Sequence, residues 1–160
     1  MGRDRFSADR EIAEEHGAIR TIAKWIELEL TRQVESVGGA RSDGPLLGPL
    51  RSFRDHLARH FRFEEESGVL AAAILARPRA AANLEKWQEQ HRRLLLRLNG
   101  SIHRLESAPA RTELGADFVS ELREFFVDLG VHDRFEDELL GASRATEFRD
   151  VQRSFEGRSG

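Results

Sequence analysis

Residues 112–140 read TELGADFVSELREFFVDLGVHDRFEDELL, and the spacing of their side chains decides the fold. Apolar and a few polar residues recur there at intervals of three and four, which places them on one face of an α-helix. The positions on this face are Leu114, Phe118, Leu122, Phe125, Leu129, His132, Glu136 and Leu140. We expect Thr112 to cap the start of this helix and Gly141 to end it.

Three segments nearer the N-terminus show the same spacing. They span Ser7 to Ser36, Leu46 to Ala76 and Asn83 to Leu105, and links that contain glycine or proline separate them. The chain has no tyrosine and is rich in alanine, leucine, arginine and glutamate, which favours helix over sheet. These observations predict an all-α protein, an up-down-up-down four-helix bundle over residues 1–142.

The length and the charge balance limit the class of protein further. A chain of 160 residues suits one domain, and a net charge of −3 argues against nucleic-acid binding. The absence of cysteine excludes disulfides and thiolate metal sites. The N-terminal residues form no apolar leader, and no apolar run is long enough to span a membrane. We therefore expect a cytoplasmic protein with no nucleic-acid or membrane partner.

Residues 143–160 form a polar C-terminal tail. Its only large apolar residues are Phe148, Val151 and Phe155, whose spacing allows a short amphipathic helix. Such a helix would dock on the bundle or on a partner, and a frayed terminus is the alternative. An apolar edge left exposed on the tail would favour a homodimer over a monomer.

Each of the four predicted helices carries one histidine on its apolar face, and two of these are followed one turn later by a carboxylate. The six residues are His16, His60, Glu64, His91, His132 and Glu136. A helical rise of about 1.5 Å per residue places all of them in one layer near the same end of the bundle. Buried carboxylates need a cation, and six ligands without sulfur suit a pair of non-haem irons better than one zinc.

Two further histidines stand outside this pattern. His56 precedes His60 by one turn, and we interpret it as a partner of a ligand or a residue at the rim, with an additional ligand as the alternative. His103 lies off the apolar face and is expected in solvent. A competing hypothesis keeps the bundle without a metal, because a single histidine on an apolar face is usually a buried, hydrogen-bonded imidazole.

The order of these six residues resembles the ligand pattern of the hemerythrin-like family, also called the HHE cation-binding domain. The resemblance covers Ser7 to Gly141, and HFRFEEE at residues 60–66 is similar to the second-helix signature of that family. It implies that Glu64 and Glu136, together with an oxo or hydroxo group, bridge two metal ions. It also implies that these ions are iron in preference to zinc or manganese. The imidazoles would then cap the irons in two pairs, His16 with His60 and His91 with His132.

Two departures from the oxygen-carrying hemerythrins affect the expected function. Their third helix has a second histidine where this chain has Leu95, which implies an open position on one iron. Their fourth helix uses an aspartate at the position of Asp137, but we prefer Glu136 because a spacing of four returns to the same helix face.

The open position would lie in an apolar pocket lined by Leu95, Phe61 or Phe135. The resemblance therefore implies a protein that binds or senses O₂, NO or iron. An enzyme that acts on peroxide or NO is the alternative. No residue is assigned a catalytic role, and the sequence does not decide whether the protein is an enzyme.

Overall fold

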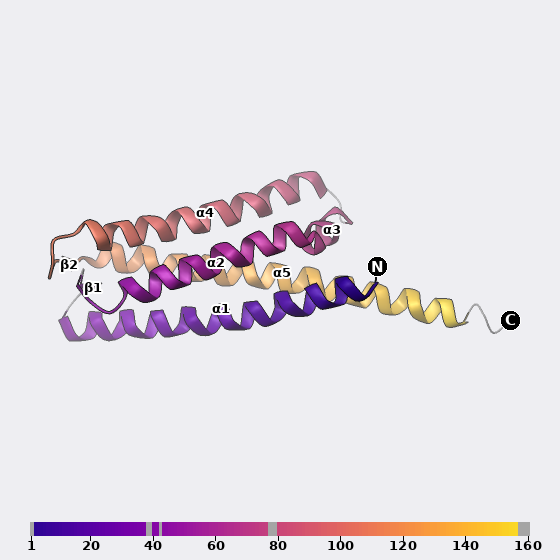
Figure 1. The fold of residues 1–160 in the computed structure, drawn as a ribbon, viewed down its shortest axis with the longest axis horizontal. Helices are drawn as coiled ribbons and strands as arrows, with labels where there is room; N and C mark the ends of the chain where they lie inside the picture. The colour runs from indigo at the N-terminus through magenta and orange to yellow at the C-terminus, as the bar shows by residue number, and fades with distance from the viewer. Residues whose placement is uncertain (1, 38–39, 42, 77–79, 157–160) are drawn as a thin grey trace.

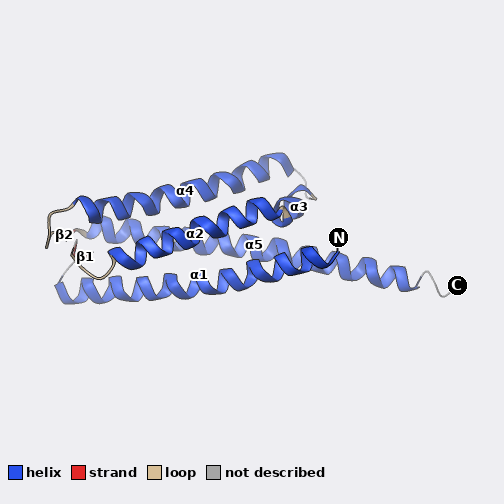
Figure 2. Cartoon of the chain, viewed as in Figure 1, coloured by secondary structure: helices blue, strands red, loops and turns tan. Residues whose placement is uncertain are grey.

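The computed structural model describes residues 2–37, 40–41, 43–76 and 80–156, and it describes the side chains of residues 10–35, 43–76 and 82–141. Nearly all of the described chain is helical (Figure 2). The helices are α1 (Gly2–Val37), α2 (Leu47–Ser67), α3 (Val69–Leu75), α4 (Ala80–Ser107) and α5 (Ala116–Glu156). Two short strands, β1 (Ala40–Arg41) and β2 (Glu113–Leu114), pair antiparallel. None of the described helices is both long and apolar enough to cross a membrane.

The four long helices lie side by side, and successive ones run in alternate directions (Figure 1). Helix α2 packs against α1 and α4, and α5 packs against the same two helices. The paired strands lie at one end of the molecule, and α3 lies at the other (Figure 1). This all-helical packing is compatible with the predicted four-helix bundle.

The predicted continuous helix over 46–76 is wrong at Gly68. That residue adopts a left-handed conformation with φ of 67°, which ends α2 and starts the separate helix α3. The hydroxyl of Ser67 donates to the carbonyl oxygen of Glu64 at 3.1 Å and accepts from the amide of Val69 at 3.4 Å. The break turns α3 so that Leu70 is buried among α1, α4 and α5.

Both predicted ends of the last helix are also wrong. Thr112 does not cap it, because its amide donates to the carbonyl of Pro109 in a turn and β2 follows before α5 begins at Ala116. Gly141 does not end it either, since glycine is tolerated inside a helix at a cost of about 1 kcal/mol. The backbone of α5 continues to Glu156, and the side chains of the tail lie outside the described ones.

The core consists of two apolar clusters at different levels of the molecule. The larger cluster fills the end near the strands and includes Phe53, Leu98 and Phe125. The smaller cluster lies near α3 and includes Ile12 and Trp87. On each long helix, the histidine of the predicted site lies in sequence between a residue of one cluster and a residue of the other. The two clusters thus enclose a polar layer from above and below, and they exclude water from it.

Candidate metal centre

The structure brings together all six of the predicted site residues. Each has at most 3% of its surface exposed. They come from all four long helices, namely His16 from α1, His60 and Glu64 from α2, His91 from α4, and His132 and Glu136 from α5. Residues spaced three and four positions apart along the apolar face of a helix point inward. The histidine of each long helix occupies one of these positions, so the periodicity that folds the helix also brings its imidazole to this layer.

Glu64 lies between the two pairs of imidazoles. Its Oε1 is 3.2 Å from Nε2 of His16 and 3.1 Å from Nε2 of His60. Its Oε2 is 3.5 Å from Nε2 of His91, on the other side. One carboxylate therefore reaches both pairs, one oxygen to each.

Glu136 repeats this arrangement from the opposite helix. Its Oε2 is 3.2 Å from Nε2 of His16. Its Oε1 is 3.0 Å from Nε2 of His132 and 3.4 Å from Nε2 of His91. Two carboxylates thus lie at the centre of a ring of four imidazoles, and every Nε2 in the ring faces them.

These donor atoms form two overlapping groups, within each of which all ligand atoms lie within 4.8 Å of one another. One group is His16, His60, Glu64 and Glu136, and the other is Glu64, His91, His132 and Glu136. The groups share both carboxylates and none of the imidazoles. The arrangement can hold two cations side by side, with the carboxylates between them.

The hydrogen-bonding state of the donors fits a metal. Among the described residues, Nε2 of His60 and His132 and Oε2 of Glu64 and Glu136 are buried without a hydrogen-bond partner. Their close neighbours in the layer do not have hydrogen-bond geometry toward them. Leaving such groups unsatisfied costs on the order of 1–3 kcal/mol each, and a cation in the layer would satisfy all four.

The outer nitrogen of His16 is held by Asp137. Nδ1 of His16 donates to Oδ1 of Asp137 at 2.8 Å, and Arg20 donates to the other oxygen of the same carboxylate at 3.0 Å. A hydrogen bond at Nδ1 fixes the ring orientation and leaves Nε2 for the centre. Asp137 therefore orients His16 from outside the layer, whereas Glu136 lies within it.

Two other imidazoles are oriented in the same way. Nδ1 of His91 donates to Oε1 of Glu65 at 2.8 Å, and Nδ1 of His132 donates to Oε1 of Gln90 at 3.2 Å. Sequence analysis missed Glu65 and Gln90 because both lie at the edges of their helix faces. Their position directly beside a predicted ligand, in sequence as well as in space, is the signal that could have found them.

Aromatic residues pack closely around the layer. The ring of Phe61 stacks on His91, with centroids 4.0 Å apart and an interplanar angle of 4°. The indole Nε1–H of Trp87 donates to Oε1 of Glu136. Phe135, which we expected to line the pocket, is 36% exposed and lies at the surface instead.

The two remaining histidines lie outside the centre. Nε2 of His56 is 2.8 Å from a carboxylate oxygen of Glu15, in a half-exposed pair between α2 and α1. This contact supports the interpretation of His56 as a residue at the rim. His103 is exposed, as expected, and lies beside the hydroxyl of Ser107 at 3.3 Å.

The carboxylates change the pKa values of the histidines around them. Burial alone would lower the pKa of His16, but the carboxylates of Glu136, Glu64 and Asp137 raise it to about 11. Burial would also lower the pKa of His132, but the carboxylate of Glu136 outweighs this effect and raises the pKa. Burial would raise the pKa of Glu136, yet the adjacent histidines hold it well below its usual value. A proton on His16 therefore balances part of the buried carboxylate charge where no cation does.

Asp133 is a buried acid that sequence analysis did not find. It is 1% exposed, and neither of its carboxylate oxygens has a hydrogen-bond partner among the described residues. The nearest basic group with which it forms an ion pair is the guanidinium of Arg20, at 4.0 Å. Burial raises the pKa of Asp133 to about 6. Asp133 follows His132 directly in the sequence, and it faces α1. From the helical periodicity of α5, this position is expected at the edge of the core.

An all-helical fold with a buried layer of imidazoles and carboxylates defines a helical domain that binds metal cations. The chain belongs to the hemerythrin family, because the model of the hemerythrin HHE cation-binding domain matches residues 7–142. Comparisons with curated proteins and with solved structures give no match. The family membership confirms the resemblance inferred from the sequence, and the individual ligand roles stay a prediction.

Proposed function

We propose that this protein is a non-haem di-iron protein that binds or senses O₂, NO or iron. The observation that carries the proposal is the pair of overlapping four-residue groups that share Glu64 and Glu136. A centre for one metal would need only three or four of the six donors. Two divalent cations between two carboxylates also balance the buried charge better than one.

The donor set supports iron. It contains four imidazoles and two carboxylates, and the chain has no cysteine to favour a softer metal. Each group offers two imidazoles in addition to the shared carboxylates, so positions remain for a bridging oxygen and for a small exogenous ligand. Two irons, when bound, supply reversible ligand binding and a change of oxidation state.

The residues of the chain determine how selective such a centre is. Asp137, Glu65 and Gln90 hold three imidazoles in a fixed orientation, and the apolar clusters on both sides keep bulk water away. Leu95, where oxygen-carrying hemerythrins have a further histidine, packs against the larger apolar cluster. These features favour a small uncharged ligand such as O₂ or NO over a bulky substrate.

Metal analysis combined with an ultraviolet–visible spectrum tests the proposal. Protein produced with ample iron should contain two irons per chain and show oxo-to-iron charge-transfer bands, which bleach on reduction. Zinc and manganese should be present only in small amounts. A colourless protein without bound metal after production with ample iron would contradict the proposal. A change of the spectrum on addition of NO or O₂ to the reduced protein would then identify the ligand.

A further inference from the structure

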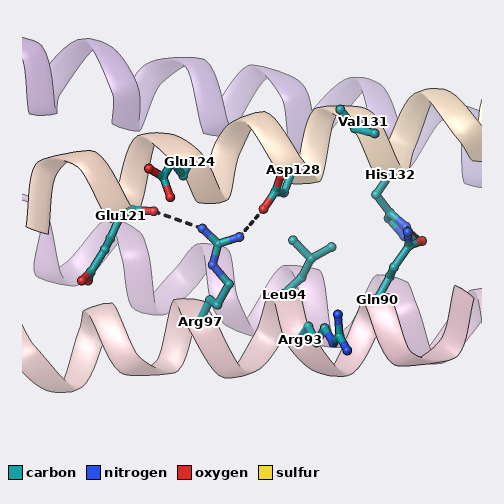
Figure 3. Close-up of a pocket in the computed structure, with 9 residues that line it drawn as sticks. All are labelled: Gln90, Arg93, Leu94, Arg97, Glu121, Glu124, Asp128, Val131 and His132. Carbon is teal, nitrogen blue, oxygen red and sulfur yellow. Dashed lines mark hydrogen bonds and ion pairs between the residues drawn. The ribbon is translucent and has the colours of Figure 1, made fainter. Parts of the chain in front are cut away.

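A cleft of about 620 Å³ lies between α4 and α5. Figure 3 shows Arg97 crossing it from α4 toward Asp128 and Glu121 on α5, with His132 and Gln90 at one end. The guanidinium of Arg97 donates to the carboxylate of Asp128 and, at 3.5 Å, to the backbone carbonyl of Glu121. The cleft is partly open to solvent along its length, and one of its ends is formed by a residue of the candidate metal centre.

The imidazole of His132 separates this cleft from the centre. Its Nδ1 faces Gln90, which is exposed, and its Nε2 lies 3.0 Å from Oε1 of Glu136 inside the layer. A rotation of this one side chain would connect the cleft with the carboxylates. The hydrogen bond to Gln90, at 3.2 Å, holds the ring in the closed position.

The charges along the cleft favour a cation. Arg97 is paired with Asp128, and Arg93 shares the carboxylate of Glu89 with Arg92. Glu121 is paired with Arg104 on the same side. Glu124 also lines the cleft, and among the described residues it has no basic partner. Two arginines and three carboxylates line the cleft, so the lining carries a net negative charge that attracts cations toward His132.

We infer that this cleft is the access route of the metal cation to the centre. Glu124 attracts the ion, and the hydrogen bond between His132 and Gln90 keeps the imidazole in the position that closes the route. The inference rests on the proposed function, because it requires a centre that takes up metal. It names two positions, Glu124 and Gln90, for which the family match gives no role. A route for anionic ligands would instead be lined by an excess of basic side chains.

The route can be tested with the full-length metal-free protein and Co²⁺, whose visible absorption reports binding to imidazole and carboxylate. Val131 is 51% exposed on the wall of the cleft, so Val131→Trp should obstruct it without disturbing the core. We expect uptake of Co²⁺ and its release to a chelator to slow by a similar factor, about tenfold or more, with an unchanged final stoichiometry. Leu96→Trp, at a 72% exposed position of α4 that does not line the cleft, is the matched control and should load at the parent rate.

Two charge variants test the sign of the attraction. Glu124→Gln should slow uptake roughly threefold, and Arg97→Gln should accelerate it by a similar factor because it frees Asp128. Both effects should diminish at high ionic strength. Gln90→Ala should accelerate both the uptake and the release of Co²⁺, because the hydrogen bond between His132 and Gln90 slows the passage of the ion in both directions. A merely structural role of Gln90 would change the melting temperature without changing these rates.

The outcomes separate the route from the proposed function. If the parent takes up no Co²⁺, the proposed metal centre is wrong. If the parent loads but Val131→Trp loads equally fast, the access route alone is wrong. If Val131→Trp does not fold, the charge variants decide, since rates that are unchanged or shift in the same direction overturn the route.

Discussion

Two carboxylates buried inside a ring of imidazoles make the centre sensitive to single substitutions. Glu64→Gln keeps the side-chain volume but replaces the anion that we propose bridges two irons with a neutral amide. We expect this variant to bind at most one iron per chain, and to bind it weakly. Because metal binding stabilises the folded state, the iron-loaded variant should melt below the parent. Metal analysis and thermal melting measure the two effects.

The control for this substitution lies on the same helix. Glu66 is exposed and lies outside the centre, so Glu66→Gln should keep two irons and the parent melting temperature. With metal removed by a chelator, Glu64→Gln should be destabilising, because it takes away one of the carboxylates that hold the proton on buried His16. A variant that melts higher than the parent and binds as much iron would contradict the di-iron assignment.

The raised pKa of His16 predicts proton release on metal binding. A folded-state pKa of about 11, above the ordinary 6.5, means that the ring is protonated at pH 7 in the metal-free protein. Its stabilising effect is fully present below pH 6.5 and is lost as the pH rises through about 11. A cation must displace this proton, so the affinity for metal should rise with pH. Titration calorimetry in buffers of different ionisation enthalpy measures the released protons, and a heat independent of buffer would contradict the prediction.

Asp133 also makes the stability of the folded protein fall as the pH rises, but at a lower pH, and because its ionised form is unfavourable in the buried site. Its folded-state pKa of about 6, compared with 3.8 for an ordinary aspartate, means that the metal-free protein loses stability as the pH rises through this range. The shift corresponds to roughly 3 kcal/mol above pH 6. Asp133→Asn should therefore raise the melting temperature at pH 8 and raise it less at pH 5. An equal gain at both values would show that the carboxylate is not the cause.

At the scale of helices, the sequence predicted the long helices and the layer they share, but not where the helices end. The spacing of three and four along an apolar face specifies which side chains point inward, and this is why the six predicted residues meet in one buried layer. Helix ends depend on local competition instead. Gly68 breaks a periodic segment, whereas Gly141 is carried through one, although both are glycines beside apolar residues. The orienting residues Glu65 and Gln90 were missed because their contacts depend on the rotation of one helix against its neighbour.

The break at Gly68 gives a prediction of its own. A Cβ at this position would meet nothing within 4 Å, so the cost of Gly68→Ala comes from the left-handed backbone alone, about 1–2 kcal/mol. Gly100→Ala, at an equally open position inside α4, should instead stabilise by about 0.5–1 kcal/mol. Chemical denaturation of both variants measures the difference. Effects of the same sign would mean that Gly68 does not require its conformation.

At the scale of the whole molecule, the metal layer lies between two apolar clusters and not in a surface groove. His16, for example, lies between Ile12 of the smaller cluster and Ile19 of the larger one. Metal binding therefore joins two parts of the core that pack separately, and the metal-free protein must bury the same polar layer with protons in place of cations. The stability of the two halves should consequently be coupled through the centre.

The C-terminal part of α5 extends beyond the other helices (Figure 1). All six candidate ligands and the partners that orient them lie at or before Asp137. Removal of residues 143–160 should therefore leave two irons per chain and the same charge-transfer spectrum. An isolated helix of this length is only marginally stable in water, and we propose that a second copy of the chain packs against the extension. Light scattering of the full chain and of the truncated form tests this, because the mass should fall by about half on truncation if the extension joins two copies. Loss of iron on truncation would contradict the prediction that the centre is complete without the tail.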